Sequence, residues 1–315
     1  MQKIIETKNI RKRYLFFLFI FPCVLTIYAQ DNHKTVIVCT YNYKLPPQER
    51  KLSPQEHEIH YLTSTYDKTY SITLSETKDF SSAMNEAFPT KNILLFVHGD
   101  DFDIEKLSII SADFHKLYNV NTVLFAWSSY RCYNNSIKNY NNSKKNIDLC
   151  FPHFIQLVDS IKNYAIKNNV KASVIFHSLG NIFAQKYSLY LENNPDVQQI
   201  FTNIIINSAC VPTKKHDLWI DVLCQKASNN VYITVNNKDK ILKLASIFIE
   251  HKTMLGQNYG RKTSKNAHYI DFTYFLKKGS NDKKMPSCHT YFISYPPREN
   301  LEIKKFYYTL FNSNF

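Results

Sequence analysis

The stretch over residues 171–191 (KASVIFHSLGNIFAQKYSLYL) contains the residue with the clearest chemical potential, Ser178. The run 172–176 is apolar and partly β-branched, which is typical of a strand buried on both faces of a parallel sheet. After Ser178 the large apolar residues recur at helical spacing instead. The sequence therefore predicts a strand, a tight turn and a helix, with the serine hydroxyl raised at the helix N-terminus, where it could act as a nucleophile.

Glycine usage marks two turns near this serine. The chain has 5 glycines among 315 residues, far below an average usage of about 7%. Gly180 follows Ser178 by two positions, and Gly99 ends the apolar run 92–99 (NILLFVHG). Because glycine allows close approach of two backbones, we expect both turns to lie beside the serine.

Five short stretches resemble the α/β-hydrolase superfamily and occur in its order. They are VHGD (97–100), FAWSS (125–129), FHSLGN (176–181), NNKD (236–239) and CHTYF (288–292). Within the superfamily the chain looks most like a little-characterised bacterial serine-esterase-like branch. The resemblance implies an α/β fold with a mostly parallel central sheet and helices on both faces. Phe176 departs from it, because the pattern G-x-S-x-G has a glycine there.

The resemblance also implies an acid partner. Asp239 follows the strand expected at 231–235, where superfamily members commonly place the acid, and the order Ser178, Asp239, His289 matches theirs. Asp239 would equally suit the N-cap of a helix that starts at Lys240. Asp221 is the alternative acid.

The base implied by the resemblance is His289, which precedes an aromatic segment late in the chain. Other histidines come too early or lie in a polar insertion (His216, His251 and His268). His98 and His177 flank the two glycine turns, and we expect them to shape those turns.

These residues together predict acyl transfer. His289 would accept the Ser178 proton, and Asp239 would orient the imidazole. Backbone N–H groups of Leu179 and Asp100 would form an oxyanion hole, at roughly 3 to 4 kcal/mol per donor. The expected substrate is a small-molecule ester or a lipid, and no cofactor is implied. Since no cysteine pair has zinc-site spacing, no metal is expected.

The elements that must position these residues alternate along the chain. Strands are expected at 35–39 and within 60–75, a helix after Asp79, and a helix–strand pair over 104–127. This alternation predicts a parallel sheet in one domain spanning residues 30–315.

Later segments give a weaker pattern. Residues 128–146 have no periodicity, so we expect an irregular excursion that is either a lid or a solvated insertion. A helix over 154–165 and strands at 201–206 and 269–275 complete the sheet, with a polar insertion before residue 231.

Composition supports one large core, with 44% hydrophobic residues. The formal charge of +13 and the pI near 9.2 raise the question of nucleic-acid binding. Lysines are spread along the whole chain and no nucleic-acid motif occurs, so we expect no nucleic-acid partner.

The N-terminus predicts an export signal. Residues 8–13 hold four basic side chains, residues 14–28 are almost wholly apolar, and Ala29 offers a small cleavage residue. The run contains Pro22 and is short for a membrane span. We expect residues 1–29 to be removed and the protein to be periplasmic or extracellular. The alternative is an uncleaved anchor, which would be the only membrane contact.

Export would expose six cysteines to oxidising conditions (Cys39, Cys132, Cys150, Cys210, Cys224 and Cys288). Short loops favour the pairs Cys132–Cys150 and Cys210–Cys224. The alternative is that several cysteines are small buried hydrophobes.

Two functions of different class remain. The first is a serine hydrolase of the carboxylesterase or lipase kind. The second is a catalytically impaired binding protein of the cell envelope on the same fold. Phe176 and the acidic pair Asp100–Asp101 favour the second.

Overall fold

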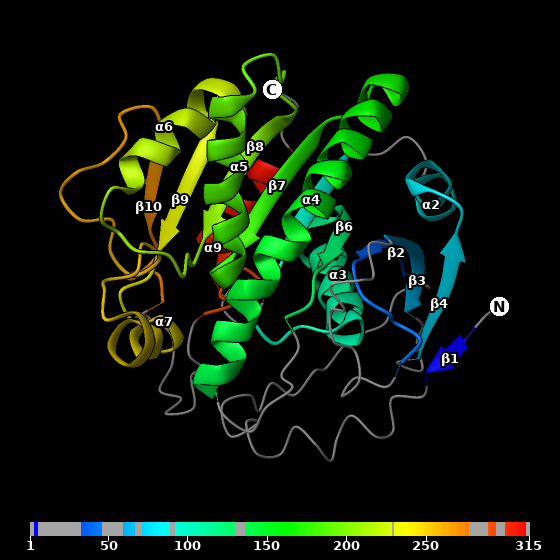
Figure 1. Cartoon of the computed structure of the whole chain (residues 1–315), viewed down its shortest axis with the longest axis horizontal. Coiled ribbons are helices and arrows are strands. Elements are labelled where there is room, and N and C mark those ends of the chain that lie inside the picture. The colour runs from blue at the N-terminus through cyan, green and yellow to red at the C-terminus, as the bar shows by residue number, and fades with distance from the viewer. Residues whose placement is uncertain are drawn as a thin grey trace.

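The computed structural model describes residues 3–5, 33–45, 59–66, 71–88, 92–129, 136–228, 230–276, 289–293 and 300–312. These residues form a ten-stranded sheet in the order β1-β4-β3-β2-β6-β5-β7-β8-β9-β10 (Figure 1). The strands are β1 (Lys3–Ile5), β2 (His33–Cys39), β3 (His60–Tyr66), β4 (Ile72–Thr77), β5 (Ile93–Val97), β6 (Asn121–Ala126), β7 (Ala172–His177), β8 (Phe201–Asn207), β9 (Val231–Val235) and β10 (His268–Asp271).

The sheet is mostly parallel, as predicted. Strands β2, β6, β5, β7, β8, β9 and β10 pair in parallel, whereas β3, β4 and β1 extend one edge in antiparallel fashion. Parallel strands bring their carboxyl ends to one edge, which is where open α/β sheets bind ligands. The turns after β5, β7, β8 and β9 therefore meet at one edge of the sheet.

Helices cover both faces of the sheet, and the apolar side chains of the central strands alternate between them. Leu95 and Val97 of β5 join one core cluster, and Leu94 and Phe96 join the other. The first face is covered by α2 (Phe80–Ala87), α4 (Ser136–Asn168), α5 (Asn181–Asn193) and α6 (His216–Lys226), and the second by α3 (Ile104–Tyr118) and α9 (Leu301–Asn312). Figure 1 shows α4 and α5 in front of the sheet and α9 behind it.

Helix starts follow their capping residues. Asp79 accepts a hydrogen bond from the backbone N–H of Ser82 at 2.7 Å, and Asp103 accepts one from Lys106 at 2.9 Å. Such caps satisfy N–H groups that have no partner inside the helix. The helix expected after Asp79 therefore begins where the sequence places it.

The expectation of an irregular excursion at 128–146 is wrong in its larger part. Helix α4 begins at Ser136 and continues through residue 168, so the segment that lacked periodicity is mostly helical. The cause lies on its inner face, where Asn139, Ser143 and Asn146 are buried in place of apolar residues. Helix α6 likewise occupies the region that was expected to be a polar insertion.

The expected disulfide Cys210–Cys224 is also wrong. Cys150, Cys210 and Cys224 are free thiols with buried side chains, so the pair Cys210–Cys224 does not form. Cys150 Sγ instead lies 3.3 Å from Thr40 Oγ1. Its expected partner Cys132, like Cys288, lies outside the described residues. These thiols match the alternative reading, in which cysteines are small buried hydrophobes.

The apolar N-terminal run at 14–28 lies outside the described residues, so the export signal stays a prediction. Lys3–Ile5 forms the edge strand β1 on β4, and removal of residues 1–29 would leave β4 at that edge. Of the helices within the described ranges, none combines the length and the apolar character that crossing a bilayer requires.

Candidate active site

Ser178 lies directly after β7 in a strained turn. Its φ of 54° falls in the left-handed region, which non-glycine residues rarely adopt. The turn continues as the 3₁₀ segment η5 (Ser178–Gly180) into α5. Hydrogen bonds hold it in place: the backbone N–H of Cys210 donates to the Ser178 carbonyl at 3.0 Å, and Asn181 Nδ2 lies 2.9 Å from the same oxygen.

Both turn glycines are required by close backbone contacts. A Cβ atom on Gly180 would lie 2.4 Å from the His98 carbonyl oxygen and 2.7 Å from that of Val97. A Cβ atom on Gly99 would lie 2.6 Å from Ser178 Cβ. The turn after β5 therefore touches the turn after β7, as the glycine positions predicted.

Phe176 occupies the place of the missing glycine without disrupting this turn. Its side chain is fully buried in the core beneath α4, with its ring centroid 5.8 Å from that of Phe154. The phenyl ring therefore packs away from the serine, and the strained conformation at Ser178 forms beside it.

Asp239 and His289 lie together at the same edge of the sheet. His289 Nδ1 and Asp239 Oδ2 are 2.6 Å apart, and the Asp239 side chain is fully buried. The other carboxylate oxygen, Oδ1, accepts a hydrogen bond from the backbone N–H of Leu242 at 3.0 Å and caps α7 (Lys240–Ala245). Asp239 is thus both an N-cap and the partner of the imidazole. Because a carboxylate oxygen only accepts hydrogen bonds, the proton in this contact is on Nδ1.

His289 lies beside the serine turn. Its ring centroid is 4.7 Å from that of His177, the residue before Ser178. Its backbone carbonyl accepts a hydrogen bond from Ser208 Oγ at 3.0 Å, at the end of β8. The contacts between described residues include no hydrogen bond from Ser178 Oγ to the His289 ring. In unliganded enzymes such bonds are often long and shorten when substrate binds.

The orientation of His177 is set by a buried polar network. Asn207 Oδ1 accepts hydrogen bonds from Thr234 Oγ1 at 3.0 Å and from the Tyr307 hydroxyl. Its amide nitrogen therefore faces His177 Nδ1 at 3.2 Å and donates to it. Tyr291, two residues after His289, donates to Thr234 Oγ1 at 2.6 Å. The network connects the His289 loop to the strand ends.

Two buried histidines beside the serine are held neutral. Burial lowers the pKa of His98 to about 3, although its Nδ1–H donates to the Gly99 carbonyl at 2.7 Å. Burial lowers the pKa of His177 well below its ordinary value, and the neighbouring His289 lowers it further. Trp127 Nε1 donates to the His98 carbonyl at 3.0 Å, and its ring stacks on the imidazole. Both histidines act as parts of the turns, as expected.

The carboxylates of Asp100 and Asp101, the acidic pair after Gly99, both contact neighbouring side chains. Ser143 Oγ of α4 donates to Asp100 Oδ1 at 2.6 Å. Asp101 Oδ2 lies 3.4 Å from Lys106 Nζ, and the Asp101 N–H donates to the Ser129 carbonyl at 3.1 Å. Asp100 follows the glycine that touches Ser178, and Leu179 is the fully buried residue after the serine. The two backbone N–H groups expected to bind an oxyanion thus come from the two turns that meet.

The alternative residues from the sequence lie elsewhere. Asp221 is on α6 and accepts a hydrogen bond from Ser264 Oγ. His216 binds the Thr213 carbonyl and the Tyr269 hydroxyl at the start of α6. His251 and His268 are exposed side chains. None of these groups forms the bond to His289 that Asp239 forms.

Sequence reasoning missed several residues around the site. Asn181 Nδ2 also lies near the carbonyls of Phe176 and Asn207, at 3.1 and 3.2 Å, and so ties the turn to β8. The thiol of Cys210 lies 3.6 Å from the Tyr140 hydroxyl, and burial raises its pKa to about 12. The sequence signal for such residues was an asparagine placed close to the end of a predicted strand. A buried asparagine needs hydrogen-bond partners, so it marks a place where backbone groups converge.

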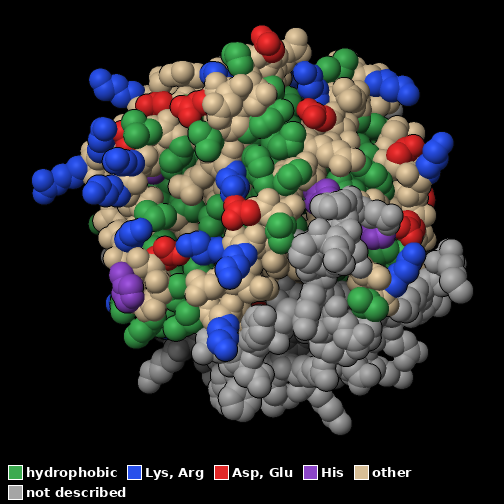
Figure 2. Space-filling view, in the orientation of Figure 1, with side chains coloured by type: hydrophobic (Ala, Val, Ile, Leu, Met, Phe, Trp, Pro, Cys, Tyr) green, Lys and Arg blue, Asp and Glu red, His purple; other side chains and the backbone are tan. Residues whose placement is uncertain are grey.

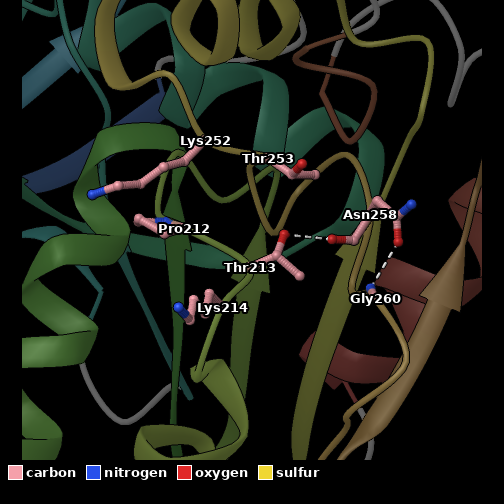
Figure 3. A pocket seen from close by; sticks show the side chains of 7 residues that line it. All are labelled: Pro212, Thr213, Lys214, Lys252, Thr253, Asn258 and Gly260. Atoms are coloured by element: carbon pink, nitrogen blue, oxygen red, sulfur yellow. Dashed lines mark hydrogen bonds between the residues drawn. The ribbon is translucent and has the colours of Figure 1, made fainter.

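A cavity of about 410 Å³ is lined by two segments, residues 212–214 and residues 252–260 (Figure 3). It is lined by Pro212, Thr213, Lys214, Lys252, Thr253, Asn258 and Gly260. It includes neither Ser178 nor His289. Among the described residues, no three His, Cys, Asp or Glu side chains gather as a metal site would require.

A parallel sheet with a serine on a left-handed strand-to-helix turn at its carboxyl edge defines the α/β-hydrolase fold. The chain belongs to the family described as "Alpha/beta hydrolase of unknown function (DUF900)", whose profile matches residues 72–295. The resemblance inferred from the five motifs is therefore confirmed.

A comparison with curated proteins gave no match. Among solved structures, the chain is similar to an uncharacterised protein from Capnocytophaga ochracea DSM 7271, with a TM-score of 0.39 and 9% sequence identity. The match covers 89% of this chain and 65% of that one, so the chain spans less than two thirds of that protein.

Proposed function

We propose that the protein is a serine hydrolase that cleaves carboxylic esters with Ser178 as nucleophile, His289 as base and Asp239 as the orienting acid. The observation that carries the proposal is the 2.6 Å contact between His289 Nδ1 and Asp239 Oδ2 beside the strained serine turn. This contact leaves Nε2 as the ring nitrogen available to accept a proton.

The reaction follows from these assignments. His289 Nε2 removes the hydroxyl proton while Ser178 Oγ attacks the ester carbonyl carbon. The backbone N–H groups of Leu179 and Asp100 bind the developing oxyanion. The imidazolium then protonates the leaving alcohol, and water hydrolyses the acyl-serine by the same steps in reverse. We extend the proposal to the compartment: the enzyme acts outside the cytoplasm after loss of residues 1–29.

Asp100 is the weakest element of this arrangement, because a carboxylate near an oxyanion opposes its formation. The bond from Ser143 Oγ to Asp100 Oδ1 supports the proposal, since it draws the side chain toward α4. The same acidic residue is the observation that favours the second candidate, a binding protein on a hydrolase fold.

One experiment separates the two functions. The purified chain is assayed with p-nitrophenyl esters of increasing acyl length and labelled with a fluorophosphonate probe. We expect turnover and labelling in the wild type, and loss of both in Ser178→Ala. Ser160→Ala is the matched control, since the Ser160 hydroxyl lies on α4 and donates to the Gln156 carbonyl at 2.8 Å, so this variant should still be labelled at Ser178. Labelling that persists in Ser178→Ala would refute the nucleophile, and absence of all activity would favour the binding protein.

A further inference from the structure

The helical segment that begins at Asp239 exposes large apolar side chains on its outer surface. Helix α7 continues into the π-helix η6 (Ser246–Glu250). Leu244 of α7 is 51% exposed, and Ile247 and Phe248 of η6 are 49% and 62% exposed. These positions lie three and four residues apart and are neighbours on one face. Leu242 and Ala245 already face the core. The segment is therefore apolar on both sides, whereas a surface helix is normally polar outside.

The same surface is basic. Lys240 and Lys243 are exposed one turn before the apolar residues, and we call these five residues, Lys240, Lys243, Leu244, Ile247 and Phe248, the α7 face. Neither lysine forms a salt bridge with a residue that the structure describes. The nearby acids are already engaged, since Asp239 is buried and Glu250 lies 2.7 Å from Lys144 Nζ. The α7 face thus presents apolar and cationic groups with no exposed acid among them.

Figure 2 shows this combination as hydrophobic side chains with lysine and arginine side chains beside them, at the lower left where Figure 1 draws α7. Exposed apolar groups that gather in this way usually mark a binding surface.

The cavity of Figure 3 directly follows the α7 face in the chain. Its lining includes Lys252, two residues after η6, and Lys214. Figure 3 shows both ammonium groups on the side opposite Asn258. Asn258 Oδ1 accepts a hydrogen bond from the Gly260 N–H at 2.7 Å, so its amide group remains a donor. The two ammonium groups and the Asn258 amide do not converge on one point in Figure 3, so the cavity is not part of the contact proposed below.

We propose that the α7 face docks on an anionic phospholipid surface, with its apolar side chains in the interface and Lys240 and Lys243 beside the headgroup phosphates. Amphipathic helices with lysines beside large apolar residues bind membranes in this way. A nucleic acid would use the lysines but would leave Leu244, Ile247 and Phe248 in water. The contact is peripheral, differs from the N-terminal anchor considered from the sequence, and does not depend on catalysis by Ser178.

The test is co-sedimentation of the full chain with vesicles of phosphatidylcholine containing phosphatidylglycerol, and with vesicles of phosphatidylcholine alone. The variant Leu244→Ser/Ile247→Ser/Phe248→Ser should lower the partition coefficient on anionic vesicles by about tenfold or more. Lys240→Gln and Lys243→Gln should each lower it by about fivefold at low salt and have little effect at high salt. Ser178→Ala should bind as the wild type does.

Matched controls use exposed leucines elsewhere. Leu189 on α5 is 58% exposed and Leu218 on α6 is 55% exposed, so Leu189→Ser and Leu218→Ser remove similar surface. Both should leave binding unchanged. The apolar N-terminal run is present in every variant and contributes equally to all of them. Binding unaffected by the triple variant, an equal loss in a control, or loss that accompanies conversion of a dimer to a monomer in sedimentation velocity would each overturn the proposal.

Discussion

Asp239 uses its two carboxylate oxygens for two different partners. Oδ1 caps α7 through the Leu242 N–H, and Oδ2 contacts His289 Nδ1. From the sequence these were alternatives, yet one side chain satisfies both because the oxygens point in different directions. Capping also fixes the rotamer that presents Oδ2 to the imidazole.

The two roles of Asp239 can be separated by substitution. Asn caps helices about as well as Asp, so Asp239→Asn should change the free energy of unfolding by only a few tenths of a kcal/mol. It should lower kcat by roughly 10⁴-fold, because the imidazole loses its orienting acid. Asp239→Ala should lower kcat similarly and also cost about 1 kcal/mol of stability. Urea unfolding and ester hydrolysis measure both quantities. An active Asp239→Asn enzyme would contradict the assignment.

Gly99 and Gly180 differ in what an added methyl group would meet. At Gly180 it meets backbone carbonyl oxygens, so Gly180→Ala should destabilise the fold by about 2 to 3 kcal/mol. At Gly99 it meets the Ser178 side chain, and Gly99→Ala should lower kcat by about 100-fold through displacement of that side chain. Thermal unfolding and kinetics distinguish the two outcomes. If both variants lost stability and activity to the same extent, the assignment of Gly180 to the fold and of Gly99 to the position of the Ser178 side chain would be wrong.

At the scale of elements, the sequence predicted the strands better than the helices. The runs that became β5, β7 and β8 are continuous apolar segments, and their burial on both faces preserves that signal. The N-terminal half of α4 was missed because Asn139, Ser143 and Asn146 occupy its buried face. Asn146 Nδ2 donates to the Ser128 carbonyl at 2.8 Å. Ser143 and Asn146 interrupt the apolar spacing of the buried face between Tyr140 and Ile147, and this interruption hid the helix.

The site was predictable to the extent that it follows chain order. The motif order placed the serine, the aspartate and the histidine at turns that meet at one sheet edge. The motif order did not predict the structural roles of Asn181 and Asn207. Their hydrogen-bond partners are carbonyls and hydroxyls that are distant in the sequence and come together only in the fold. Pairwise contacts of this kind have no local pattern.

A buried amide of the sheet forms a hydrogen bond to the backbone of helix α9. Asn203 Nδ2 of β8 donates to the Leu310 carbonyl in the last turn of α9 at 2.7 Å. Asn203→Ala should lower the free energy of unfolding by about 1 to 3 kcal/mol, because that carbonyl loses its partner. Asn193→Ala removes an exposed bond within α5 and should change stability by less than about 0.5 kcal/mol. Urea unfolding of both variants measures the difference, and equal losses would contradict this role for Asn203.

At the scale of the whole molecule, the buried histidines should make the protein sensitive to acid. The pKa of His98 is about 3 in the folded state, against 6.5 ordinarily, and that of His177 is also depressed. Below about pH 6.5 the unfolded chain binds protons that the folded chain does not, so stability falls as pH falls. His98 should cost about 2 kcal/mol of stability between pH 8 and pH 5, and His177 should lower the stability in the same direction.

Urea unfolding at the two pH values tests this expectation. His98→Gln should show a smaller loss of stability on acidification than the wild type, by about 2 kcal/mol. The exposed His251 provides the control, since His251→Gln should leave the pH dependence unchanged. An unaltered slope in His98→Gln would show that His98 is not held neutral.

The free thiols lead to a second expectation for the molecule as a whole. Cys150, Cys210 and Cys224 are buried, and burial raises the pKa of Cys224 to about 11. A raised thiol pKa slows alkylation, since the thiolate is the reactive form. Iodoacetamide should therefore modify these three residues only after denaturation, as measured by peptide mass spectrometry. Rapid modification of Cys210 in the native protein would contradict its burial.

The double attachment of Asp239 links the outside of the molecule to its chemistry. The Asp239 carboxylate caps α7, whose outer surface is hydrophobic and cationic, and it also contacts the His289 imidazole. A tilt of that helix would rotate the carboxylate and reset the imidazole with it. In the proposed enzyme, a ligand bound to this helix would therefore change kcat without contacting Ser178.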